Sequence, residues 1–179
     1  MRNILSSLGI FLGLALPAQD AGMHEPTRHH KALAAQVGTW VAVARMYVSP
    51  TKPPLVSHGT EVNTLVAGGL WLRTELKATL MGSPFEGHGL FGYDTLAKAH
   101  VGSWVDSSGT WMAVTRGSCE RDCQVQTAFF DGYDEAGRPA LHKEVHTQVD
   151  ANHRTMVMFL RVQDGTWVKS MEMTYTRLK

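Results

Sequence analysis

The sequence is short of charge, of cysteine and of recognisable catalytic motifs. Charged residues make up 18% of its 179 residues, the formal net charge is +1, and no basic block is present. Nucleic acids and anionic membranes attract clustered positive charge, so we predict neither as a partner. A hydrophobic share of 44% still predicts one globular domain with a sizeable core.

No stretch of the chain matches a nucleophile elbow, a phosphate-binding loop or a zinc-binding helix motif. Nor does a long helical pattern of apolar residues follow Gly38. These absences disfavour the enzyme classes built on such motifs and indicate an all-β chain. We predict no cofactor and no metal site, and the sequence leaves the oligomeric state open.

The N-terminus has the pattern of a signal peptide. Arg2 supplies a positive charge ahead of the apolar run ILSSLGIFLGLALPA, which is too short to span a bilayer comfortably. We predict a signal peptide over residues 1–18, cleaved after Ala18. The mature protein is then periplasmic or secreted, with no stable membrane insertion. The alternative is an uncleaved anchor.

The two cysteines lie together in the segment SCERDCQ. Export permits disulfides. If the three residues between the cysteines form a hairpin loop, Cys119 lies opposite Cys123 on the neighbouring strand, within disulfide distance. We therefore predict a Cys119–Cys123 disulfide, with two free thiols as the alternative.

Turn signals divide the rest of the chain into short strands. Residues 19–37 are predicted to hold a polar lead and one short helix over PTRHHKALAAQV, which Gly38 ends. From there GG, SG and DG dipeptides and several longer turns separate about ten strand-like runs. Regular spacing of this kind predicts an antiparallel up-and-down β-barrel over residues 38–179.

The DG turn at residues 164–165 sets the register of the last hairpin. A two-residue turn brings four methionines to one face of the sheet. The predicted pairs are Val162–Trp167, Met158–Met171 and Met156–Met173. Methionine suits an adaptable ligand pocket, ordinary core packing or a soft metal such as Cu(I), and the sequence leaves these three interpretations open.

Two carboxylates are predicted to face the barrel interior. The GG turn at residues 68–69 places Glu61 on the inner face of its hairpin. Registers carried round the barrel place Asp106 inside as well, together with Trp111 and Phe129. Asp106 has a second interpretation, because it also begins the turn sequence DSSG.

The stretch SPFEGHGLFGYD, residues 83–94, has the apolar spacing of a strand but holds three glycines. If MGSP forms the preceding loop, Gly87 and Gly89 lie on the inner face, and if the next turn pairs Tyr93 with Lys98, Gly87 faces Trp104. The glycines then admit the indole of Trp104 and let the strand bend. His88 then points outward. A change of one residue in a flanking loop reverses the two faces, so an inward His88 is the alternative.

Trp40 in GTW and Arg177 in YTR bracket the predicted barrel. The two positions are similar to those of lipocalins and fatty-acid-binding proteins, in which a late arginine packs over the tryptophan of the first strand. The motifs HKALAAQVGTW, VAGGLWL, MGSPFEGHGLFGYD, SWVDS and MEMTYTR together resemble the bacterial domain-of-unknown-function family 1579, over about residues 29–178. The resemblance implies a lipocalin-like, calycin-type barrel and supplies no reaction.

Three functions are compatible with this fold. We favour a binding module, an exported barrel that holds a small apolar or amphipathic ligand. The second is an enzyme that uses Glu61 and Asp106, with or without His88, for acid–base chemistry. The third is a barrel filled by its own side chains that serves as a structural or interaction module. The candidate ligand-binding residues are Glu61, His88, Tyr93, Trp104, Asp106, Trp111, Met156, Met158, Met171 and Met173.

Two groups of histidines are assigned to the surface. His142, Glu144 and His146 in HKEVH share one strand face at a metal-like spacing, but no further ligand is evident and we expect an exposed polar face. His29 and His30 lie on the predicted N-terminal helix, where we expect them to contact solvent.

Overall fold

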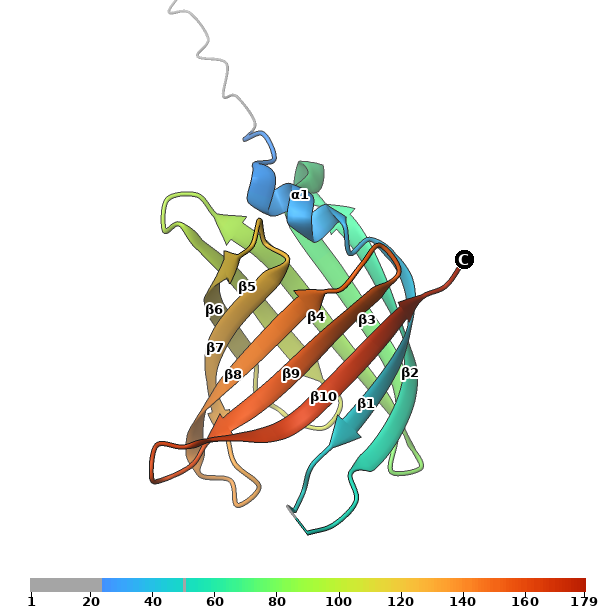
Figure 1. Cartoon of the computed structure of the whole chain (residues 1–179), viewed down its shortest axis with the longest axis vertical. Helices are drawn as coiled ribbons and strands as arrows, with labels where there is room; N and C mark the ends of the chain where they lie inside the picture. Colours follow the sequence, from blue (N-terminus) through green and yellow to red (C-terminus); the bar gives the residue numbers. More distant parts are fainter. Residues whose placement is uncertain (1–23, 50) are drawn as a thin grey trace, which may run out of the picture.

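The computed structural model describes residues 24–49 and 51–179, so the predicted signal peptide lies outside the described residues. The antiparallel strands close into one barrel, in which each strand pairs with its neighbours along the chain and β10 pairs with β1 (Figure 1). The predicted ten-stranded up-and-down barrel with a short N-terminal helix is confirmed. Its elements are α1 (Arg28–Ala34), β1 (Gly38–Met46), β2 (Leu55–Val66), η1 (Ala67–Gly69), β3 (Trp71–Leu80), β4 (Ser83–Asp94), β5 (Ala99–Asp106), β6 (Ala113–Glu120), β7 (Val125–Tyr133), β8 (Pro139–Gln148), β9 (His153–Arg161) and β10 (Trp167–Arg177).

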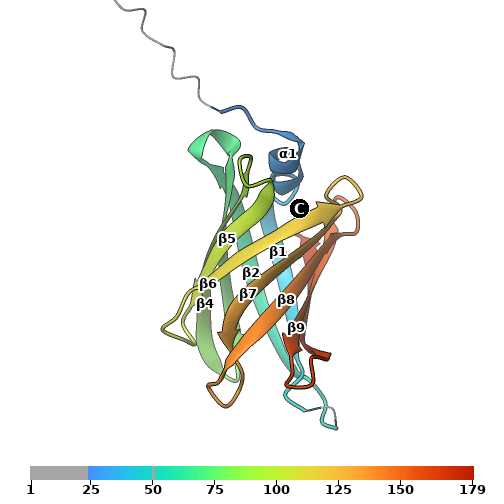
Figure 2. The same cartoon turned by 90° about the vertical axis from the view of Figure 1, so that its left-hand side faces the viewer.

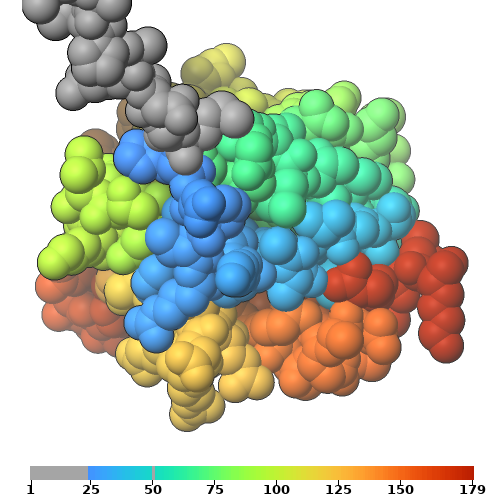
Figure 3. Space-filling model, turned by 90° about the horizontal axis from the view of Figure 1, so that it is seen from above, coloured from blue at the N-terminus to red at the C-terminus, as the bar shows by residue number. Residues whose placement is uncertain are grey.

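Helix α1 lies across one end of the barrel, which we call the helix end (Figures 1 and 3). The opposite end, the loop end, carries the turns at residues 81–82, 107–112, 134–138 and 162–166. The strands are steeply tilted between the two ends (Figure 2), as closure of a barrel requires. Among the described residues, no helix has the length and apolar character needed to cross a bilayer.

The helix end is fastened by Trp40 and Arg177, the pair that bracketed the predicted barrel. Trp40 is fully buried, and the guanidinium carbon of Arg177 lies 4.1 Å from the centre of its ring. Arg177 also donates hydrogen bonds to the carbonyl oxygens of Ala35 and Ala151, each at 2.8 Å. The indole nitrogen of Trp40 donates to the carbonyl of Gln36 at 2.8 Å. These contacts join the segment after α1 to β1 and to β10, the first and last strands along the chain.

The methionine register of the last hairpin is confirmed, although the turn that predicted it is longer than expected. Met171 pairs with Met158 and Met173 with Met156, but Trp167 pairs with Arg161 and not with Val162. The loop therefore shifts the register by one residue. An irregularity between Lys169 and Met171 shifts it back, so the two offsets cancel before the methionines are reached.

The glycine-rich strand β4 packs as predicted around Trp104. Gly87 and Gly89 are buried, and a Cβ atom added to Gly87 would lie 2.2 Å from Cζ2 of Trp104. Trp104 pairs with Gly89 in the ladder, so its indole leans diagonally over Gly87. We expected Gly87 to be the direct partner. The register differs by two residues, which preserves the face.

The hairpin that carries the cysteines has a different register from the predicted one. A turn over Arg121–Gln124 replaces the three-residue loop, and Cys119 pairs with Gln126 in the ladder. Because the shift is an odd number of residues, it reverses the faces of the following strand. Phe129, predicted to lie inside, is 41% exposed, and Phe130 is buried in its place.

The disulfide itself is present between Cys119 and Cys123, whose Cα atoms are 4.7 Å apart. Cys123 lies within the turn and reaches back to the end of β6. We expect the protein, when produced in an oxidising compartment, to keep its mass after alkylation without reductant, and to gain two alkyl groups once a reductant is added. Intact mass measurement checks this result. Alkylation of both cysteines before reduction would contradict it.

Candidate functional site

A cavity of about 370 Å³ lies inside the barrel. Leu33 and Gln36 line it at the helix end, and Leu80, Ser108 and Trp111 line it at the loop end. Ser108 is exposed and Trp111 is 40% exposed, so the cavity reaches solvent beside the β5–β6 loop. The volume is of the order that one small organic molecule occupies in a ligand pocket.

Apolar side chains form most of the cavity wall. The four predicted methionines all line it, two of them from β9 and two from β10. Met156 and Met173 are buried, and Met158 and Met171 pack against the same core cluster. Phe85 and Trp104 contribute from the opposite side of the barrel. Unbranched thioether side chains that line a cavity can rearrange around different guests.

A buried ion pair lies at the helix end of the cavity. Arg154 of β9 donates to the carboxylate of Glu61 of β2, and each side chain is about 5% exposed. Glu61 also accepts a hydrogen bond from Nδ2 of Asn63 at 2.7 Å. The guanidinium carbon of Arg154 lies 3.6 Å from the ring centre of Tyr175 and 4.8 Å from that of Trp40. The predicted inward position of Glu61 is confirmed, but its partner Arg154 was not identified from the sequence.

Two polar groups at this ion pair, one on Arg154 itself and one on Tyr175, can still form hydrogen bonds. Nε of Arg154 is buried and finds no acceptor among the described residues. The hydroxyl of Tyr175 donates to the sulfur of Met173 at 3.2 Å, a weak acceptor. Burial raises the pKa of Tyr175 well above its ordinary value, so the phenol stays protonated. Both side chains line the cavity and are available to a polar group of a guest.

Asp106 and Trp104 form a second polar point, towards the loop end. The indole nitrogen of Trp104 donates to Oδ2 of Asp106 at 2.9 Å. Oδ1 of Asp106 accepts from the backbone nitrogen of Ser108 at 2.9 Å and from its hydroxyl at 2.5 Å. Asp106 therefore both lines the cavity and begins the turn, so the two interpretations of this residue hold together.

The polar face of β8 points into the cavity, which corrects the expected exposure of HKEVH. His142, Glu144 and His146 all line the cavity, and Glu144 is only 9% exposed. The cause is the pairing with β9: Glu144 lies opposite Met158 and His146 opposite Met156. Nε2 of His146 is 3.5 Å from the Glu144 carboxylate. These three residues extend the polar lining beyond the ion pair.

Two predicted site residues lie away from the cavity. His88 is on the outer surface, where its Nε2 is 2.9 Å from the Glu86 carboxylate and both side chains are about half exposed. This is the favoured outward placement, and it leaves the surface pair no access to an interior ligand. Tyr93 is on the inner face of β4, like Gly87 and Gly89, but it lies beyond the cavity at the helix end. There its ring stacks on His29 at a centroid distance of 3.8 Å.

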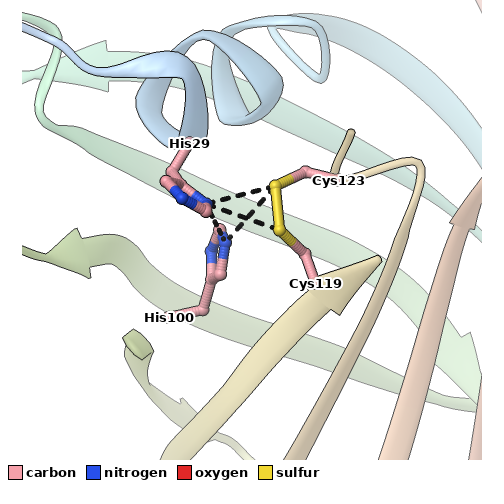
Figure 4. Close-up of side chains that lie close together, drawn as sticks. All are labelled: His29, His100, Cys119 and Cys123. Carbon is pink, nitrogen blue, oxygen red and sulfur yellow. Dashed lines mark hydrogen bonds between the residues drawn. A yellow bond between two sulfur atoms is a disulfide. The ribbon is translucent and has the colours of Figure 1, made fainter. Parts of the chain in front are cut away.

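A separate cluster at the helix end was missed by the sequence analysis. It consists of His29, His100, Cys119 and Cys123, and we call it the His₂Cys₂ cluster (Figure 4). The four nitrogen and sulfur atoms that face each other all lie within 4.8 Å of one another. His29 belongs to α1, His100 to β5 and the cysteines to the β6–β7 hairpin. The expected solvent contact of the helix histidines is wrong for His30, which is 3% exposed, whereas His29 stays partly exposed and directs its ring at the cluster.

Comparisons with known proteins identify the fold and leave the activity open. Residues 25–177 match a family described as a protein of unknown function, DUF1579. Among proteins with curated descriptions, none matches. The crystal structure of Rv2717c from M. tuberculosis is similar with a TM-score of 0.59 at 15% identity, over 87% of this chain and 100% of that one. A redesigned β-barrel, b11L5F_LGL, has a TM-score of 0.45 at 12% identity, over 83% of this chain and 96% of that one.

Proposed function

The chain belongs to the DUF1579 family, and from its own interior we propose that it binds one small apolar or amphipathic molecule inside the barrel. The observation that carries the proposal is the cavity of about 370 Å³ with its mainly apolar wall. Ligand sites are typically concave and apolar, with a few polar groups that orient the guest. A barrel filled by its own side chains, the third function considered, does not account for a volume of this size.

The distribution of polar groups favours an amphipathic guest. Glu61, Arg154 and His146 line the helix end of the cavity, and Phe85, Met158 and Met171 form an apolar wall in the half nearer the loop end, where Asp106 and Ser108 stand at the rim. A guest that enters beside the β5–β6 loop can place a polar group near Arg154 and leave its apolar part against the methionines. Burying apolar surface stabilises the complex by about 25 cal/mol per Å².

The inward carboxylates have structural partners in the free protein. Glu61 is held by Arg154 and Asn63, and Asp106 by Trp104 and Ser108. Each of these carboxylates therefore has a role in fixing the wall of a binding site. The two carboxylates shape the binding site and orient the guest, and no reaction is assigned to them.

The proposed binding protein acts outside the cytoplasm. The predicted signal peptide and the Cys119–Cys123 disulfide support export, because structural disulfides persist in oxidising compartments. A closed barrel with an internal pocket suits the transport or sequestration of a molecule that dissolves poorly in water.

Filling the cavity tests the proposal. An environment-sensitive apolar dye is expected to bind the wild-type protein, and Met171→Trp is expected to weaken this binding by about tenfold or more, equal to about 1.4 kcal/mol. The added indole would occupy the part of the cavity beside β9 and β10 that the guest needs. Fluorescence titration measures the affinity, and thermal unfolding verifies that the barrel is intact.

The matched control is Thr174→Trp, which adds the same ring to an exposed, outward position of the same strand, opposite Thr155. It should bind the dye as the wild type does. If the wild type fails to bind the dye and Met171→Trp lowers stability by about 1–3 kcal/mol through overpacking, the methionines are packed core and the proposal is wrong.

A further inference from the structure

We propose that the His₂Cys₂ cluster binds one zinc ion when its disulfide is reduced. The site lies between α1 and the barrel wall, at the margin of the ligand cavity, which His100 also lines, and the proposal does not depend on what the cavity holds. Two imidazoles and two thiolates in a tetrahedral arrangement form a ligand set typical of structural zinc.

Four of the distances between the ligand atoms approach those of a tetrahedral zinc site, and the two bonded sulfurs would have to move apart to about 3.8 Å after reduction. With Zn–N near 2.05 Å and Zn–S near 2.3 Å, two nitrogens are separated by about 3.3 Å and a nitrogen and a sulfur by about 3.6 Å. In the structure, Nδ1 of His29 lies 3.2 Å from Nε2 of His100. It lies 3.4 Å from the sulfur of Cys119 and 3.2 Å from that of Cys123. Nε2 of His100 is 3.8 Å from the sulfur of Cys123.

The disulfide alone does not explain this convergence. Disulfide sulfurs carry no proton and are weak acceptors, so they give the two imidazoles little reason to face them. Between two neutral imidazoles, only one nitrogen can donate to the other. A zinc ion at the common centre would engage both nitrogens and both sulfurs at once.

The two imidazoles are held in place by a neighbouring ring. Stacking on Tyr93 with an interplanar angle of 5° fixes the plane of the His29 ring. The Tyr93 ring also lies edge-on to that of His100, with the ring centres 5.1 Å apart. Nδ1 of His29 and Nε2 of His100 therefore already face the sulfur of Cys123 without movement of α1.

Metal binding requires reduction first. A dithiol reductant transfers two electrons and two protons to the Cys119–Cys123 bond, which breaks to give two thiols while the reductant forms its own disulfide. Zinc then binds both sulfurs as thiolates and releases the two thiol protons. Two thiolates balance the charge of Zn²⁺, so the occupied site is neutral in its partly buried position.

The zinc ion would link three elements that are distant in sequence. In the oxidised protein, the cysteine pair closes only its own hairpin, with a separation of four residues. A bound zinc ion would add direct bonds from that hairpin to α1 through His29 and to β5 through His100. Leu33 and Gln36, in and beside α1, line the cavity. Metal binding would therefore fix the segment that closes the helix end of the pocket.

Cobalt and zinc titrations of the exported protein, oxidised and reduced, test the proposal. The reduced protein is expected to bind one Co²⁺, with the intense visible bands of a tetrahedral site and a thiolate charge-transfer band. Zinc should displace the cobalt and abolish the colour. The oxidised protein should show none of these bands. Zinc should also protect residues 24–37 of the reduced protein from limited proteolysis.

Variants distinguish a site of four ligands from metal binding by the two cysteine thiols alone. His29→Gln should weaken binding by at least about tenfold, whereas His58→Gln, at an exposed position of β2, should leave it unchanged. Equal affinities of these two variants, or an octahedral cobalt spectrum, would overturn the proposal. So would a reduced protein that binds no metal, or one that has lost its β-sheet circular dichroism, because the site requires the folded barrel.

Discussion

Glu61→Ala is expected to lower the free energy of unfolding by about 3–5 kcal/mol, because it leaves a buried arginine without its counter-charge. The Arg154 side chain is 6% exposed, so bulk solvent screens the unpaired charge only weakly. The nearby rings of Trp40 and Tyr175 compensate the unpaired guanidinium charge only in part. Denaturant unfolding followed by tryptophan fluorescence measures the change.

Two comparisons show whether the buried charge is the cause. Glu75→Ala removes a carboxylate that faces Arg73 at 3.3 Å on the exposed side of the neighbouring strand, and it should cost less than about 1 kcal/mol. Glu61→Leu combined with Arg154→Met removes both charges and should recover much of the lost stability. If Glu61→Ala changed stability no more than Glu75→Ala, the described burial of the pair would be wrong.

Gly87→Val is expected to destabilise the protein by about 1–3 kcal/mol or more through overpacking. The new Cβ would lie 2.2 Å from Cζ2 of Trp104, and the indole is held in place by its hydrogen bond to Asp106. The ring must therefore move or the strand must shift. Thermal and denaturant unfolding both report the loss.

Two controls for Gly87→Val change, in turn, the face of the strand that receives the valine and the ring that the valine would contact. His88→Val introduces the same side chain at the adjacent outward position and should change stability by less than about 0.5 kcal/mol. In a Trp104→Ala background, Gly87→Val should cost much less than in the wild type, because the clashing ring is absent. An unchanged melting temperature for Gly87→Val would show that the glycines do not admit the indole.

The parts of the structure that the sequence predicted well depend on short-range constraints. The alternation of strand residues and the turn signals suffice for ten strands and for the inner position of Glu61. The methionine face was predicted correctly from a turn whose length was not, because the irregularity before Met171 restored the register. That compensation has no signal in the sequence.

The parts that were missed depend on how distant elements meet. Phe129 was placed inside because the cysteine hairpin was given a three-residue loop, and the actual register reverses the following strand. The inward face of β8 follows from its pairing with the methionines of β9, which a strand-by-strand analysis does not supply. The His₂Cys₂ cluster joins a helix, a strand and a hairpin, and no spacing along the chain connects them.

The most direct test of a ligand-binding barrel is native mass spectrometry of the wild-type protein purified from its own host without detergent, alongside Met171→Trp. The account predicts that wild-type chains carry one small molecule each, or take up one from an added series of alkyl alcohols and carboxylates, and that Met171→Trp does neither. Wild-type protein that shows only the bare chain mass, before and after addition of the series, would contradict it.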